Sequence, residues 1–264
     1  MLDILIFAPK PKPNPMSNRY EKPPLIEAVC DFRLDPTSAW DLAIPGLFSE
    51  RFRELYPTRR QAATIDLAVS GVGNQVEQRL QRQDRLQLYS KDEKDVLQIG
   101  AHLLSVNRLA PYKSWEDFEP LILAAFESYL EVAQPKGLAR IDLRFINRIG
   151  IPKPVVNQED YFDFYPYLGK KLPQEIGAYL VGVELGFAEG RDRLRLEMQS
   201  AISEKPDVNT TILGLDYYCQ NPAVLGIAAI REWLAAAHRA LDDVFEGCIK
   251  DSLRELFVPQ KVLK

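Results

Sequence analysis

Residues Leu25–Leu34 (LIEAVCDFRL) and Ala139–Arg148 (ARIDLRFINR) alternate apolar with polar or charged side chains, and this alternation decides the fold class. In the first stretch the apolar side chains recur at every second position from Ile26 to Phe32. Successive side chains of a β-strand point to opposite faces, so each stretch predicts a strand with one apolar and one charged face. The sequence therefore predicts a sheet that packs on one side and presents charge on the other.

These stretches belong to a faint internal repeat of constant spacing. Three pairs of matching positions are each separated by 114 residues: Leu25 and Ala139, Arg79 and Arg193, Gly100 and Gly214. A repeat of this length predicts two copies of one βα unit that share a sheet. We expect a first repeat over residues 25–137 and a second over 138–264 in one globular body, preceded by a proline-rich arm over residues 1–24.

The remaining pattern fills in the elements of each repeat. Hydrophobic periodicity and helix-capping residues predict a helix from Ser38 to about Leu55, strands over 62–70, 75–89 and 96–107, a helix from Ser114, strands over 138–149, 179–187, 193–200 and 210–219, and a last helix from Asn221-Pro222 to about Phe257. The predicted class is α+β, with the order β-α-β-β-β-α twice. Such an order predicts a curved, mostly antiparallel eight-stranded sheet with two long helices on one face, similar to the TATA-binding-protein saddle or a helix-grip fold.

Composition and charge restrict the function classes. The chain has 264 residues, 46% of them hydrophobic, and a formal net charge of −4, which does not suit a protein that binds mainly nucleic acid backbone. Its three cysteines and two histidines lack metal-ligand spacing, so we expect reduced core thiols, a cytoplasmic location, no metal and no cofactor. No stretch approaches the length of a membrane-spanning helix, and no membrane partner is expected.

The first residues carry two interpretations. Met16 stands just before the globular pattern, so residues 1–15 are interpreted as an upstream extension, and the alternative is that Leu2–Phe7 adds a strand to a neighbour. The prolines between these segments favour extended backbone.

Two motifs carry a family resemblance. Lys22–Ala28 (KPPLIEA) and Arg140–Ile149 (RIDLRFINRI), supported by His238 in the last helix, resemble a sporadically distributed, uncharacterised prokaryotic protein family. The resemblance covers the chain from about Tyr20 onward and implies an accessory genetic system, such as defence or toxin-antitoxin modules. It implies no catalytic residues.

The charged face of the second stretch is the principal candidate site. We predict a binding surface formed by Arg140, Asp142, Arg144, Asn147, Arg148, Arg193 and Arg195. Arginine guanidinium groups bind carboxylates or other anions through forked hydrogen bonds. The alternative is a ladder of salt bridges that fixes strand register and contributes little to stability. Asn147 interrupts the apolar face, which indicates a bulge or a cap with its amide bound to backbone.

An aromatic cluster is the second candidate. Tyr161, Tyr165 and Tyr167 lie with two phenylalanines in seven positions, and Pro166 prevents a regular helix. Tyrosine is favoured where one side is buried and the other is hydrated, so the segment is either a loop over the core edge or a surface for a partner or for base stacking.

No catalytic set is evident. His238 lies at helical spacing with Leu234 and Leu241, which predicts a core histidine, and His102 is predicted in a turn. We therefore expect a non-catalytic binding or regulatory protein that docks a protein partner on the charged sheet face. The alternatives are a nucleic-acid-binding module on the saddle face and a small-ligand or enzymatic pocket between sheet and helix. The sequence indicates no oligomeric state.

Overall fold

The computed structural model describes residues 20–72, 75–219 and 229–259, with the backbone alone for residues 64–83. Its elements are β1 (Leu25–Leu34), α1 (Ile44–Arg51), β2 (Thr58–Val72), β3 (Gln75–Tyr89), β4 (Asp95–Gly100), β5 (Leu103–Leu109), α2 (Trp115–Ala133), β6 (Leu138–Ile151), β7 (Leu180–Phe187), β8 (Asp192–Ala201), β9 (Asn209–Cys219), α3 (Ile230–Cys248) and α4 (Asp251–Phe257). The predicted α+β class and dominant antiparallel sheet are confirmed.

All described strands form one sheet of nine strands, in the order β2-β3-β4-β5-β1-β6-β9-β8-β7, and every neighbouring pair is antiparallel. The two stretches that decided the class, β1 and β6, lie side by side at its centre. The predicted number of eight strands was wrong, because the segment 96–107 is two strands. The chain turns between them at His102, whose φ of 56° is left-handed.

The 114-residue spacing does not relate equivalent positions of the sheet. Arg79 lies in β3, the third strand outward from β1, whereas Arg193 lies in β8, the second strand outward from β6. The strand order itself has the same form on both sides of the central pair, since β5, β4 and β3 flank β1 as β9, β8 and β7 flank β6. Duplication of the two halves stays a prediction.

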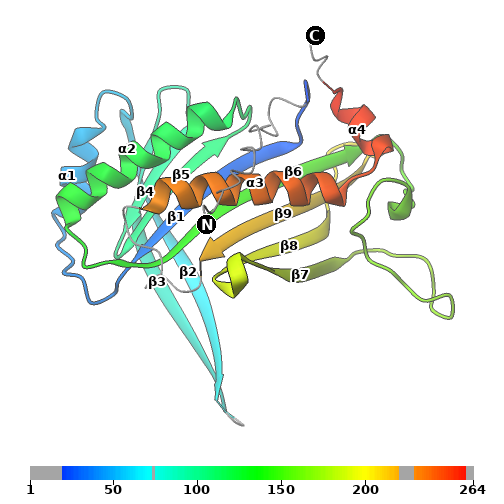
Figure 1. Ribbon diagram of the computed structural model, residues 1–264, viewed down its shortest axis with the longest axis horizontal. Coiled ribbons are helices and arrows are strands. Elements are labelled where there is room, and N and C mark those ends of the chain that lie inside the picture. Colours follow the sequence, from blue (N-terminus) through cyan, green and yellow to red (C-terminus); the bar gives the residue numbers. More distant parts are fainter. Residues whose placement is uncertain (1–19, 73–74, 220–228, 260–264) are drawn as a thin grey trace, which may run out of the picture.

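One face of the sheet is covered by the two long helices (Figure 1), with α2 against β5 and α3 against β6 and β9. Every second residue of the central strands points into this core, and Cys30, Phe32, Ile141, Leu143 and Phe145 have no exposed surface. All three cysteines are buried, as predicted. The alternation of the sequence therefore placed the core face of both central strands.

The helix boundaries differ from the pattern at two places. α1 begins at Ile44 rather than near Ser38, with Pro45 in its first turn, where proline fits because the amide there needs no helical partner. The last helix is interrupted: α3 ends at Cys248, and α4 starts at Asp251. Ile249 between them is extended and pairs with Phe162. The predicted start at Asn221-Pro222 lies outside the described residues.

Residues 20–22, where the described part of the chain begins, contact α3 and the end of α4. Tyr20 is buried, donates its hydroxyl to Glu246 at 2.8 Å and packs edge-on against Phe257. The Glu21 and Lys22 amides donate to the carbonyls at the end of α4. Among the described residues, no helix has both the length and the apolar character that crossing a membrane requires.

Candidate functional site: the open face of the sheet

The sheet face opposite α2 and α3, here called the open face, carries the predicted charged stripe. Arg140, Asp142 and Arg144 of β6 alternate with fully buried core residues, and Arg148 follows on the same side. The register places Asp142 opposite Asp31 on β1 and opposite Tyr218 on β9. Directly opposed residues of antiparallel strands share a face, so side chains from β1, β6 and β9 meet here.

Most of the stripe is paired within the chain. The Arg140 guanidinium donates to the Asp142 carboxylate and lies 3.9 Å from the Tyr218 ring centroid. Arg144 donates to Asp216 at 3.3 Å, and the Tyr218 hydroxyl donates to Glu184. Two of these contacts, Arg140 with Tyr218 and Arg144 with Asp216, join the neighbouring strands β6 and β9, as expected for the salt-bridge ladder that was the alternative interpretation of the stripe.

Burial changes the pKa of the Asp142 carboxyl at the centre of this network. Only 2% of Asp142 is exposed, and desolvation raises the pKa of its carboxyl above the ordinary value, although the Arg140 hydrogen bond acts in the opposite direction. Its Oδ2 atom and the Oδ1 atom of Asp216 are buried, and among the described residues neither has a hydrogen-bond partner. The centre of the open face therefore holds carboxylate oxygens with unused acceptor capacity.

Beside this network the open face is hollowed. A depression of about 270 Å³ lies between β6, β8 and β9, lined by Arg144, Arg195, Glu197, Gln199, Gly214 and Asp216 among others. Gly214 forms its floor: a Cβ atom built there would come no closer than 4.0 Å to any other residue. Arg195 and Glu197 are exposed, and among the described residues neither has a salt-bridge partner. The hollow thus presents a cation and an anion, two positions apart on one strand.

Asn147 and Arg148 have structural roles. Asn147 points to the core side, has no exposed surface and donates from Nδ2 to the Leu213 carbonyl at 3.2 Å. The β1–β6 register shifts beside it, with the extra residue, Ile26, on β1, while β6 pairs with β9 without a shift. A bulge at Asn147 itself therefore stays a prediction. Arg148 donates to the Ile202 carbonyl at 2.8 Å. Neither residue lines the hollow.

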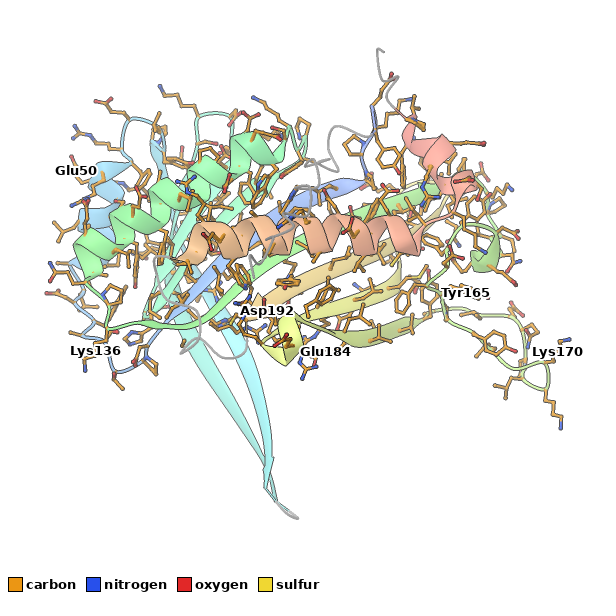
Figure 2. All side chains as sticks on the ribbon, in the orientation of Figure 1. Glu50, Lys136, Tyr165, Lys170, Glu184 and Asp192 are labelled. Atoms are coloured by element: carbon orange, nitrogen blue, oxygen red, sulfur yellow. The ribbon has the colours of Figure 1, made fainter. Side chains whose placement is uncertain are left out.

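The tyrosines lie apart from the charged stripe. Tyr161 is buried in the core, and Tyr165 is half-buried and packs against the core, while Tyr167 is 75% exposed. Figure 2 shows Tyr165 at the end of the sheet away from α2, where the chain enters the loop that carries Lys170. The structure therefore does not unite the two predicted surfaces, because the loop covers the core edge rather than the open face.

Sequence reasoning missed the polar ladder that crosses the first half of the open face. The Gln87 amide donates to Gln98, the Gln98 amide to Asn107, and the Asn107 amide to Glu27, over distances of 2.8–3.0 Å. The sequence carries little signal for it, because Gln87, Gln98 and Asn107 come together only through the pairing of three strands. The ladder gives the open face a fixed array of hydrogen-bonding groups across four strands.

His238 is the buried core histidine that the helical spacing predicted. It is 5% exposed, stacks on Trp115 with ring centroids 4.2 Å apart, and has its Nε2 atom 3.8 Å from Asp242. Burial lowers the pKa of His238 to about 4, so the ring is neutral near pH 7. Within the described ranges, no group of three or more His, Cys, Asp or Glu side chains could hold a metal ion.

Comparison with known proteins adds no identity, since no family model and no curated protein matches the chain.

Proposed function

We propose that this chain is a non-catalytic binding protein that docks a protein partner on the open face of its sheet, with the hollow above Gly214 as the centre of contact. The observation that carries the proposal is the exposed pair Arg195 and Glu197 beside a floor without a side chain. Other charges of the stripe are paired within the chain, whereas this pair is available to an outside group. The resemblance supports a cytoplasmic accessory system of prokaryotes as its setting.

The mixed charge of the hollow favours a protein over other partners. A protein segment can offer a carboxylate to Arg195 and an ammonium or guanidinium to Glu197, whereas a nucleic acid backbone offers anions only. Glu197 and the buried Asp216 would repel phosphate groups. A nucleic-acid module on this face is therefore the second candidate.

The overall organisation supports the same proposal. The equivalent strand order on either side of β1 and β6 supports a duplicated, saddle-like or helix-grip scaffold, in which the helix-free face is available for binding. Superposition of the two halves by strand position, rather than by the 114-residue spacing, is the comparison that tests the duplication.

The experiment is co-purification of the tagged full chain from its source organism, with matched charge reversals. Arg195→Glu replaces the positive charge of the hollow by a negative one without breaking a described salt bridge. Gly214→Leu places a side chain on the floor of the hollow. Arg231→Glu on the exposed side of α3 makes the same change of charge on the helix-covered side. We expect a defined partner with wild type and Arg231→Glu, and its loss with the two hollow variants.

Arg144→Glu is a poorer probe, because it would break the hydrogen bond that Arg144 donates to Asp216. Recovery of the same partner by all variants would reject the hollow as the contact. Binding of an unstructured RNA or DNA oligonucleotide that weakens steeply with salt, and is lost in Arg195→Glu, would support the second candidate instead.

A further inference from the structure

The strand β7 forms an outer edge of the sheet. It pairs with β8 alone, and among the described residues no segment pairs with its other side. Figure 1 shows β7 as the outermost strand on the side where β8 and β9 lie, beyond the reach of α3. Such an edge presents a row of backbone N–H and C=O groups that can pair with another strand.

The side chains of β7 do not protect this edge. Val183 and Leu185 on the helix-covered side are 41% and 37% exposed, and Leu180 is 70% exposed. Edge strands are commonly protected by proline, lysine or a bulge, but β7 has no proline and Glu184 is its single charged residue. The edge therefore combines unpaired backbone groups with an apolar stripe.

The backbone direction defines which residues can pair outward. The Ser200 amide donates to the Tyr179 carbonyl, so the backbone N–H and C=O groups of Tyr179 are directed toward β8. The direction of the backbone N–H and C=O groups alternates from residue to residue along an antiparallel strand. The backbone groups of Val181, Val183 and Leu185 are therefore also directed toward β8. Gly182, Glu184 and Gly186 then direct their N–H and C=O groups outward.

Two glycines of β7 are covered by side chains of opposite charge from β8. A Cβ atom at Gly186 would lie 3.2 Å from the Arg193 guanidinium, and one at Gly182 would lie 3.3 Å from the Glu197 side chain. Glu184 lies between them, accepts a hydrogen bond from Tyr218 and lies 4.0 Å from the Arg193 guanidinium of its own chain. Any strand added to this edge therefore meets a positive group beside Gly186 and a negative group beside Gly182.

We propose that a second copy of this chain pairs with β7 in antiparallel fashion, with Leu185 on the twofold axis. In this register Glu184 of one copy lies opposite Gly186 of the other, beside the partner's own Arg193 guanidinium, and the axis repeats this contact. A register with Val183 on the axis puts Glu184 opposite Gly182 and beside Glu197, which repels it. A register with Glu184 on the axis opposes two identical carboxylates. Charge complementarity thus selects the Leu185 register.

This register also joins the apolar stripes. Leu185 contacts its own copy across the axis, and Val183 lies opposite Phe187 of the second copy on the helix-covered side. The axis is perpendicular to the sheet, so both open faces remain on the same side of the dimer. The proposal does not rest on the proposed docking on the hollow, since Arg195 takes no part in the edge contact and Glu197 serves there only to disfavour the Val183 register.

The first experiment measures the oligomeric state of the full chain by sedimentation equilibrium over a range of concentrations. Glu184→Pro removes an outward N–H and leaves the backbone hydrogen bonds to β8 in place, although it also removes the carboxylate that contacts Tyr218 and Arg193. We expect loss of the dimer with unchanged circular dichroism. Arg231→Glu on α3 should remain dimeric. A wild-type chain that is monomeric at every concentration up to the solubility limit overturns the proposal, and so does a dimer that Glu184→Pro leaves intact.

The second experiment tests the register by disulfide formation under a mild oxidant such as copper phenanthroline. Leu185 is a non-hydrogen-bonded position on the axis, where opposed Cα atoms come close enough for a disulfide. Leu185→Cys should give a covalent dimer, and Val183→Cys on the same stripe should give little. Preferential cross-linking through Val183→Cys contradicts the Leu185 register, and cross-linking through neither variant contradicts the strand contact.

Discussion

At the scale of single residues, His238 is a buried base whose environment disfavours its charged form. Trp115 and Phe145 pack against its ring, and an Asp242 carboxylate oxygen is 3.8 Å from Nε2, beyond hydrogen-bond distance. Its pKa is lowered to about 4 in the folded protein, against about 6.5 in the unfolded chain.

This difference predicts loss of stability in acid. The unfolded state binds the proton first as the pH falls below 6.5, so the free energy of unfolding decreases between pH 6.5 and pH 4 and changes no further from this group below that range. The loss amounts to at most about 3 kcal/mol. Urea unfolding at pH 7, 5.5 and 4.5 measures it.

His238→Phe is the matched variant, because it keeps an aromatic ring against Trp115 and removes the titrating group. The decrease between pH 6.5 and pH 4 should be smaller in His238→Phe by the amount that His238 contributes. The buried Asp142 carboxyl, whose pKa is raised, acts in the opposite direction in both proteins and cancels in the comparison. Equal decreases in the two proteins would contradict the account.

Asn147 is the second residue whose substitution we expect to lower the free energy of unfolding. Asn147→Ala removes the donor to the buried Leu213 carbonyl beside the bulge, and we expect a decrease of about 1–3 kcal/mol in the free energy of unfolding. Gln199→Ala, on the exposed open face, should change it by less than about 0.5 kcal/mol. Denaturant unfolding of both variants gives the comparison, and equal small effects would refute a structural role for Asn147.

Sequence reasoning placed many of the candidate residues on the correct face. Alternation assigned Arg140, Asp142 and Arg144 to the charged side and Asn147 to the apolar side, because strand geometry fixes side-chain direction with a period of two. It could not assign their partners, because pairing with Asp216 depends on which strand lies next to β6. The hollow was missed for the same reason, since its floor and walls come from different strands.

At the scale of elements, the start of α2 depends on one side chain. Ser114 accepts a hydrogen bond from the Asp117 amide at 3.2 Å, as the sequence predicted for a helix cap. Ser114→Ala should lower the free energy of unfolding by about 1 kcal/mol, because the amide loses its acceptor. Ser114→Asp retains an acceptor and should remain close to wild type. Thermal or urea unfolding distinguishes them, and a similar loss in both variants would show that packing rather than capping is responsible.

The end of α3 illustrates what local patterns cannot predict. The hydrophobic periodicity continues through Ile249 toward Phe257, but the helix stops at Cys248. Ile249 pairs with Phe162, and Lys250 donates to the Tyr161 carbonyl, so the break is made by a distant segment of the chain. The aromatic segment that looked like a binding surface therefore serves in large part to fix this break.

At the scale of the whole molecule, the long helices cover one side of the sheet, and among the described residues no helix covers the other side. The class could be predicted because alternation in β1 and β6 is strong, whereas the strand number depended on one left-handed residue, His102. The 114-residue spacing matched residue types and not sheet positions, since β3 and β8 occupy different places. Topology depends on long-range pairing, which a spacing in one sequence does not contain.

The most direct test of the central claim is site-specific photo-crosslinking in the source organism. A photoreactive residue at Gln199, on the wall of the hollow, should form one defined adduct with the docked protein. The same residue at Arg231, on the exposed side of α3, should form none, and Gly214→Leu should abolish the Gln199 adduct. An adduct from Arg231 with none from Gln199, or a Gln199 adduct that survives Gly214→Leu, would contradict docking on the open face.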